Sequence, residues 1–160
     1  VTVYPKRGSF VFSPVSDEVV DLCDYRSILE EAALRIAFRR NRRGLIANLE
    51  SHIASMMQIS QQQDAVAYVQ EDIAFHRTIA RSSGNRNLAE AYARAIGPVL
   101  ALRNHLFLVM NEAPNRSLDE HRAILRACTD ADIPRAQKLL NAHVHHIAAA
   151  FSNLKRRNAR

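Results

Sequence analysis

The sequence has no tryptophan and little of what interrupts helices or cross-links chains, with four glycines, five prolines and two cysteines in 160 residues. Cys23 and Cys128 are isolated and form no CxxC pair, which argues against a disulfide framework and favours reduced thiols. No apolar run approaches the roughly 20 residues of a membrane span, and no signal-peptide pattern opens the chain. These absences predict a cytoplasmic protein that does not contact the membrane.

What the sequence does contain favours a single all-α domain. Ala, Leu, Arg, Glu and Gln recur throughout, and 160 residues with 48% apolar composition suffice for one compact core but not for two domains. Part of the formal net charge of +6 comes from two basic runs, RRNRR at 39–43 and KRR at 155–157. Such runs suit an anionic partner, including nucleic acid, although a short basic run is more often a solvated helix end.

The helical spacing of apolar residues and the signals between the runs delimit the predicted helices. Gly44 ends the first helix, and the pair Gly97-Pro98 predicts a kink or a break inside the fourth. Ser117, three residues before Glu120, fits a capping box at the start of the fifth. We therefore predict an antiparallel bundle of six or seven helices. The predicted helices cover about 17–43, 45–59, 62–82, 87–109, 117–128 and 132 to the basic C-terminus.

Residues 1–16 differ from the rest of the chain. Their sequence VTVYPKRGSFVFSP has β-forming residues on both sides of a turn at Lys6, Arg7 and Gly8, which predicts a short β-arm. We expect two parts, the arm at 1–16 and an all-helical domain at 17–160. The missing initiator methionine fits either a fragment or processed chain, or a cloning choice.

Ionisable side chains occupy core-facing positions on three of the predicted helices. In the third helix Asp72 lies one turn before His76, and both face the predicted interior. His121 and His143 take positions on the fifth and sixth helices where a leucine is expected. A lone buried histidine is more often a hydrogen-bonded core residue than a ligand. An unpaired buried carboxylate is costly, however, and a divalent metal would offset its charge, so the four residues form a plausible metal site.

Two arginines lie near the edges of apolar helix faces, where a guanidinium could bind a carboxylate in bidentate fashion beside the metal. They are Arg26 in the first helix and Arg103 in the fourth. The alternative for Arg26 is a surface salt bridge with Glu30. Four further histidines carry less weight: His145 and His146 are weak ligand candidates, and His52 and His105 have no identifiable partners.

Four blocks in this order carry a family resemblance: YRSILEEAAL, DIAFHRTIARSSGN, DEHRAILRAC and DADIPRAQKLLNAHV. They resemble the ligand-binding FCD domain in the FadR-type branch of the GntR bacterial transcription regulators. The likeness extends over about residues 21–151. It implies an all-helical effector-binding domain that forms a homodimer.

The resemblance also implies roles for particular residues. Asp72, His76, His121 and His143 correspond to the family's metal ligands, with zinc favoured over nickel or manganese. Arg26 and Arg103 are expected to contact a small organic acid effector. The segment around Lys6, Arg7 and Gly8 looks like the wing of a winged helix-turn-helix domain. That domain would bind operator DNA, and the rest of it is not in this sequence.

Two other function classes compete with this regulator, which we expect not to be an enzyme. The first is a metal-dependent hydrolytic enzyme. The sequence has neither an HExxH motif nor a set of ExxH pairs, and this argues against such an enzyme. The second is a helical interaction module without a ligand, whose stability would be indifferent to a chelator.

Overall fold

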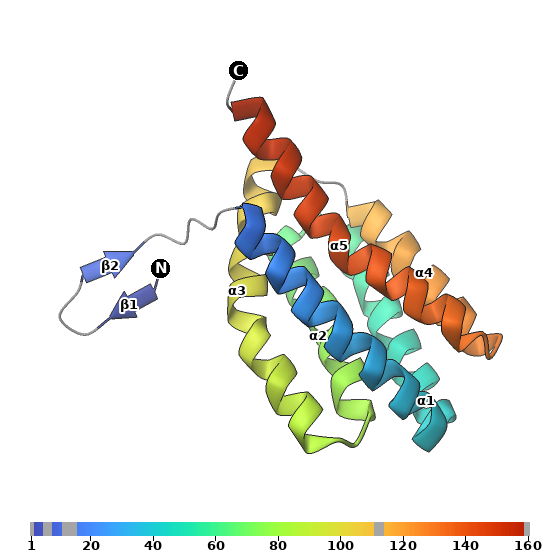
Figure 1. Cartoon of the computed structure of the whole chain (residues 1–160). Coiled ribbons are helices and arrows are strands. Elements are labelled where there is room, and N and C mark those ends of the chain that lie inside the picture. The colour runs from blue at the N-terminus through green and yellow to red at the C-terminus, as the bar shows by residue number, and fades with distance from the viewer. Residues whose placement is uncertain (1, 5–7, 11–15, 111–113, 159–160) are drawn as a thin grey trace.

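The computed structural model describes residues 2–4, 8–10, 16–110 and 114–158. Strand β1 (Thr2–Tyr4) pairs antiparallel with β2 (Gly8–Phe10), so that Val3 lies opposite Ser9. Five helices follow and pack into a bundle (Figure 1). They are α1 (Ser16–Gln61), α2 (Ala65–Ser82), α3 (Arg86–Met110), α4 (Pro114–Thr129) and α5 (Ile133–Asn158).

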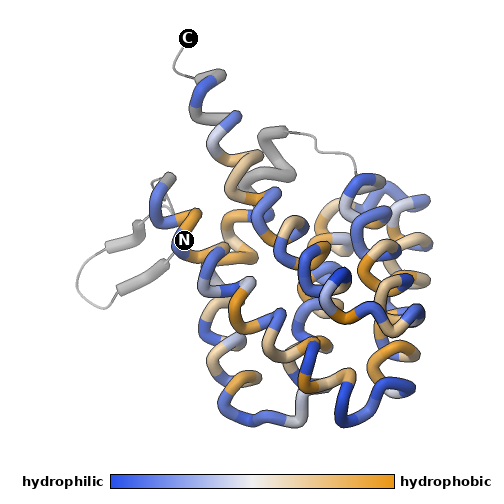
Figure 2. Tube along the Cα trace, turned by 45° about the vertical axis from the view of Figure 1, so that its right-hand side comes forward, coloured by the Kyte–Doolittle hydropathy of each residue, from blue (hydrophilic) through white to orange (hydrophobic). Residues whose placement is uncertain are grey.

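Helix α1 organises the bundle, because it packs against each of the other four helices. The shared core is aliphatic and aromatic, and Leu34, Leu49, Phe75, Ile124 and Leu140 are all completely buried in it. In Figure 2 hydrophobic residues follow inward faces of the helices, while hydrophilic residues colour the turns at the lower end. The prediction of an all-α bundle is therefore confirmed.

The described residues form five helical elements, and the first of them consists of two helices joined at a kink, so six helical segments are present as predicted. The first two predicted helices are one element, α1, with a kink at Asn41 (φ −154°, ψ 73°). The Asn41 side chain accepts a hydrogen bond from the Gly44 backbone N–H at 2.9 Å and so caps the second segment of the helix. A Cβ at Gly44 would lie 2.4 Å from the Asn41 side-chain nitrogen, so this glycine makes room for the cap and does not itself end the helix.

Other helix signals had mixed outcomes. Helix α3 is continuous through Pro98, so the predicted break is wrong. Ser117 lies inside α4, which begins at Pro114, and it is therefore not the N-cap that the sequence suggested. Two other helix ends are capped: Gly84 follows α2 with φ of +60°, and the Asp132 side chain accepts from the Arg135 N–H at 3.1 Å at the start of α5.

The basic run at 39–43 has a structural use at the kink of α1. Arg40 Nη1 donates to the Ser83 carbonyl at the end of α2 (2.7 Å), and Arg42 Nη2 donates to the Thr129 carbonyl at the end of α4 (2.5 Å). A positive charge at the C-terminal end of a helix is favourable, so these two arginines hold neighbouring helix ends against α1.

Within the described part of the chain, no helix combines the length and the apolar character needed to cross a bilayer.

Replacing Asn41 by alanine removes the cap at the kink, and we expect the free energy of unfolding to fall by about 1 kcal/mol. The matched control is Asn48→Ala, because Asn48 is exposed in the interior of the second segment. Alanine is the better helix former there, so the control should not lose stability. Urea unfolding followed by circular dichroism measures both, and equal midpoints for the two variants would contradict the capping role.

Candidate metal centre

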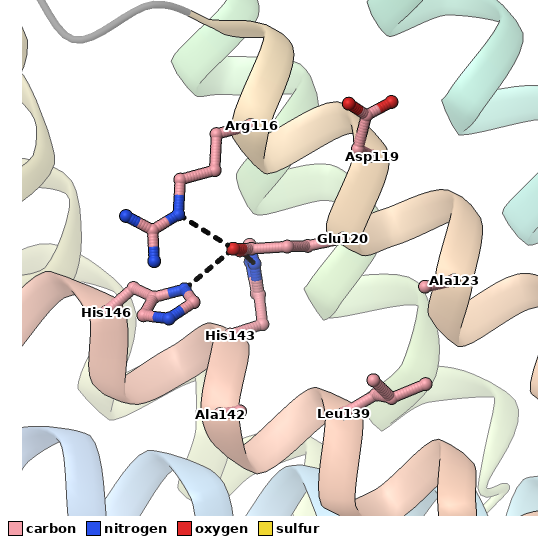
Figure 3. Close-up of a pocket in the computed structure, with 8 residues that line it drawn as sticks. All are labelled: Arg116, Asp119, Glu120, Ala123, Leu139, Ala142, His143 and His146. Atoms are coloured by element: carbon pink, nitrogen blue, oxygen red, sulfur yellow. Dashed lines mark hydrogen bonds and ion pairs between the residues drawn. The ribbon is translucent and has the colours of Figure 1, made fainter.

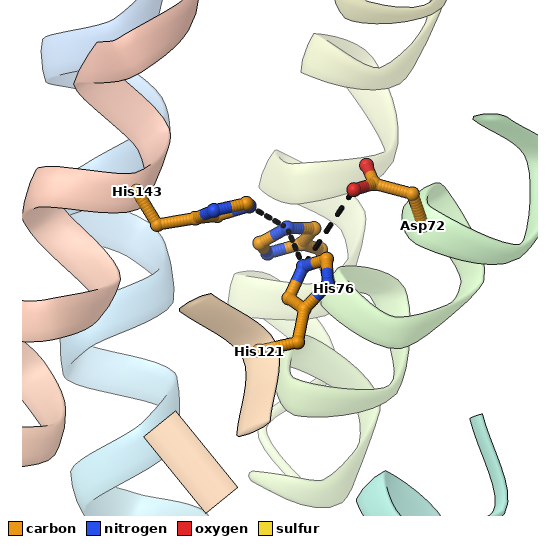
Figure 4. A group of neighbouring side chains, drawn as sticks. All are labelled: Asp72, His76, His121 and His143. Atoms are coloured by element: carbon orange, nitrogen blue, oxygen red, sulfur yellow. Dashed lines mark hydrogen bonds and ion pairs between the residues drawn. The ribbon is translucent and has the colours of Figure 1, made fainter. Parts of the chain in front are cut away.

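Three helices bring the four predicted ligands together in the interior. Helix α2 supplies Asp72 and His76 from successive turns, α4 supplies His121 and α5 supplies His143. The first three are fully buried and His143 is 3% exposed. One possible ligand atom from each residue lies within 4.8 Å of the others, and the four side chains point toward one another (Figure 4).

The nitrogen atoms are spaced as ligands of a single ion would be. The Nε2 atom of His76 lies 3.1 Å from that of His143 and 3.3 Å from that of His121. The Nε2 atom of His121 lies 3.6 Å from Asp72 Oδ1. Ligand atoms of a tetrahedral site with metal–nitrogen bonds of about 2.0–2.1 Å are separated by about 3.3 Å. The cluster therefore has the dimensions of a metal site.

Two glutamates contact two of the imidazoles at Nδ1, the ring nitrogen that faces away from the centre of the cluster. Glu30 on α1 contacts His76 Nδ1 at 2.5 Å, and Glu120 on α4 contacts His143 Nδ1 at 2.7 Å. Metal-binding histidines typically donate their other ring N–H to a carboxylate in this way. With protons on both Nδ1 atoms, two Nε2 lone pairs face each other at 3.1 Å. A cation between them removes the repulsion.

The electrostatics favour neutral imidazoles in the cluster. Burial lowers the pKa of His76 and of His121 well below the usual range, with further lowering from Arg26 at His76 and from His143 at His121. An extra proton is therefore a poor substitute for a metal ion between the rings. Burial alone would raise the pKa of Asp72, but the charge of Arg103 is the chief influence that lowers it, so this carboxylate is ionised.

Asp72 offers one oxygen to the protein and leaves the other available. Its Oδ1 accepts from Arg103 Nη2 at 2.5 Å and from the Ser117 hydroxyl at 3.1 Å. Its Oδ2 is buried and has no hydrogen-bond partner among the described residues. An unpaired buried carboxylate oxygen is costly, and coordination of a cation would satisfy it. The residues present thus fit a divalent metal.

Arg26 is buried and not a surface residue, since only 1% of it is exposed. The expected pair with Glu30 is present, with Nε donating to Oε1 at 2.5 Å. Burial opposes the charged form, but the charge of Glu30, together with smaller contributions from Tyr92, Asp72 and the hydrogen bond to Glu30, raises the pKa of Arg26. Within the described structure its Nη1 and Nη2 atoms have no hydrogen-bond partner, and the buried Tyr92 side chain lies nearby. The two Nη nitrogens of this buried guanidinium are thus available to an acceptor from a bound molecule.

Sequence reasoning missed Glu30 and Glu120 as supports of the histidines. Glu30 was weighed only as a surface partner of Arg26, although its spacing from Arg26 puts both on one face of α1. Glu120 immediately precedes His121 in the sequence, so it points to a different side of α4 from that histidine, toward α5. Both glutamates contact histidines on other helices, so no local sequence pattern could have identified them.

The other histidines lie outside the cluster. His52, for which we expected no partner, bridges Glu71 at 2.7 Å and Thr78 at 2.8 Å. His145 contacts Asp24, and His146 contacts Glu120. The side chain of His105 and residues Lys6 and Arg7 are outside the described part of the chain, whereas Gly8 opens β2.

Comparison with known proteins identifies the bundle. The family model of the FCD domain matches residues 21–146, which is most of the chain. The chain belongs to the FCD domain family. The predicted resemblance is thereby confirmed, and an FCD domain of the GntR type is a regulatory, effector-binding domain.

Regulators are among the relatives of this FCD domain. A Streptomyces ambofaciens protein, an uncharacterized HTH-type transcriptional regulator in an unstable DNA locus, is 28% identical over 98% of the chain and 64% of its own length. In structure, the chain is similar to Lar, which controls the expression of the Listeria monocytogenes agr system and mediates virulence (TM-score 0.75, 14% identity, 88% of this chain, 66% of Lar). It is also similar to Streptococcus agalactiae GntR (TM-score 0.64, 21% identity, 86% of this chain, 62% of that one). The chain spans less than two thirds of each of these relatives.

Protein purified without a His tag or chelator should contain about one divalent metal ion per chain, because one set of four ligands converges. His143→Ala should lose it, whereas His145→Ala should keep it, since the His145 ring contacts Asp24 instead. Inductively coupled plasma mass spectrometry measures the content. Wild-type protein that stays metal-free after incubation with zinc, nickel and manganese would contradict the site.

Glu30→Gln should weaken metal binding by about 10- to 100-fold, the usual cost of losing the carboxylate behind a ligating histidine. Glu31→Gln is the matched control, because the Glu31 side chain contacts Asn141 and not the cluster. Competition against a chromophoric chelator gives both dissociation constants. Equal constants for the two variants would show that Glu30 does not support His76.

Proposed function

We propose that the chain is the effector-binding and dimerisation domain of a GntR/FadR-type transcription regulator, which senses a small carboxylate through a metal-anchored pocket. The observation that carries the proposal is the convergence of Asp72, His76, His121 and His143 beside the unpaired Nη atoms of Arg26. Bound zinc, nickel or manganese would act as a Lewis acid that attracts oxygen ligands. Zinc is favoured for a set of three imidazoles and one carboxylate.

The charges around the centre support an acidic effector. Asp72 is paired with Arg103, and Glu30 is paired with Arg26, so these four charges cancel. A divalent cation bound to neutral histidines therefore adds two positive charges to a buried site, and such a charge requires compensation. A small organic acid can supply it, with one carboxylate near the metal and Arg26 as a forked donor. Arg103 completes the charge balance by holding Asp72.

The remaining parts of a regulator belong to the proposal as well. A homodimer would match the two-fold symmetry of operator DNA, and a DNA-binding domain outside this chain would contact that DNA. The segment around Lys6, Arg7 and Gly8 would be the end of its wing. Binding of the acid changes DNA affinity only by the difference in its affinity for the two arrangements of the dimer.

The two alternatives make different demands. A metal-dependent hydrolase would turn over a simple ester or phosphoester, and the regulators among the relatives favour sensing over catalysis. An interaction module without a ligand would have the same melting temperature with and without a chelator. A module without a ligand does not explain the two unpaired guanidinium nitrogens of Arg26 beside the cluster.

Mono-, di- and tricarboxylates tested by thermal shift should raise the melting temperature of metal-loaded protein and not of metal-free protein. Arg26→Lys should abolish the rise, because lysine keeps the charge but lacks the forked pair of donors. The matched control, Arg94→Lys, changes an exposed arginine on α3 and should respond like the wild type. A rise that persists in Arg26→Lys would remove Arg26 from the effector site.

A further inference from the structure

We propose that the cleft between α4 and α5 is the route by which a divalent cation reaches the buried centre, with Glu120 and His146 as its transient ligands. This inference rests on the proposed metal centre and adds a second, outer binding step to it. The argument uses the burial of the inner ligands, the lining of the cleft and the contacts of Glu120.

The inner ligands cannot be reached directly from solvent. Asp72, His76 and His121 are fully buried, and His143 is 3% exposed. A cavity of about 730 Å³ opens between α4 and α5, and His143 forms part of its wall (Figure 3). None of the other three ligands lines this cavity. His143 is therefore the ligand at which the cleft and the buried cluster meet.

Glu120 connects the two sides of this wall. Its Oε2 accepts from His143 Nδ1 at 2.7 Å, on the side of the buried cluster. Its Oε1 contacts His146 Nδ1 at 2.8 Å and Arg116 Nε at 3.0 Å, on the side of the cleft (Figure 3). One carboxylate thus joins an outer imidazole, 38% exposed, to a metal-binding imidazole.

The outer pair can accept a cation at small cost. Carboxylate and imidazole are ligands that zinc, nickel and manganese all accept. The competing partner of Glu120 is Arg116, which is 60% exposed. Such an exposed salt bridge is weak, so breaking it costs little. Glu120 can therefore exchange Arg116 for a metal cation in the cleft.

The inward transfer ends at the His143 ring, whose Nδ1 donates to Glu120 on the cleft side and whose Nε2 faces the buried cluster. From Glu120 the next ligand is His143, and the Nε2 atom of His143 lies 3.1 Å from that of His76. The rest of the cleft wall consists of Ala123, Leu139 and Ala142, which offer no ligand, and the exposed Asp119, whose carboxylate is paired with Arg122 at 3.1 Å. The polar groups that a cation meets in the cleft thus lead toward the cluster.

The experiment measures uptake kinetics with Co²⁺ alone as the probe. Metal-free protein is mixed with Co²⁺ in a stopped-flow instrument, and the visible absorption of the bound ion gives the rate and the final amount. His146→Ala should slow uptake by about tenfold, the lower end of what charged clefts contribute to association rates. The final Co²⁺ content should stay at the wild-type value. His145→Ala is the matched control, because His145 lies next in sequence but contacts Asp24, and it should bind at the wild-type rate.

Arg116→Ala provides an opposite expectation, since removing the competing guanidinium should leave uptake equal to or faster than that of the wild type. Normal Co²⁺ binding with equal rates for His146→Ala and His145→Ala would overturn the route and leave the metal centre intact. A lower final content in His146→Ala would also overturn it, by making His146 part of the final site. Wild-type protein that binds no Co²⁺ at all would overturn the metal centre and the route together.

Discussion

The arrangement depends on the burial of three imidazoles and a carboxylate in one interior. Nitrogen lone pairs of His76 and His143 face each other because Glu30 and Glu120 hold the protonated side of each ring. A cation at the centre of such a cluster would stabilise it, because Arg103 compensates only the charge of Asp72. The fixed charges near the cluster are thus arranged in pairs, and the neutral rings remain for an ion.

Helix α1 links this interior to the rest of the bundle. Its first segment carries Arg26 and Glu30, and Glu30 contacts both that arginine and His76. Its second segment starts at the capped kink, where Arg40 and Arg42 hold the ends of α2 and α4. Helix α1 contributes none of the four cluster residues, yet it orients His76 and holds the ends of the two helices that carry three of the four.

Much of this arrangement was accessible from the sequence, for physical reasons. Helical periodicity placed Asp72 and His76 on one inward face, and it showed His121 and His143 in positions normally filled by leucine. The place where the first two predicted helices join could not be predicted, because Gly44 is a typical signal for a helix end. The kink lies instead at Asn41, whose side chain accepts from the Gly44 N–H and caps the second segment. Ser117 had the pattern of an N-cap, but its hydroxyl instead donates to Asp72. Contacts between residues far apart in sequence, such as those of Glu30 and Glu120 with the histidines, depend on tertiary packing that no local pattern encodes.

The spacing of the ligands along the chain has a consequence for biosynthesis. The four residues lie between positions 72 and 143, and the last of them is in the final helix. During translation the ligand set is incomplete until α5 has left the ribosome and packed against α1 and α4. A nascent or truncated chain therefore lacks the complete cluster, so metal loading of the proposed site would be confined to finished, folded molecules.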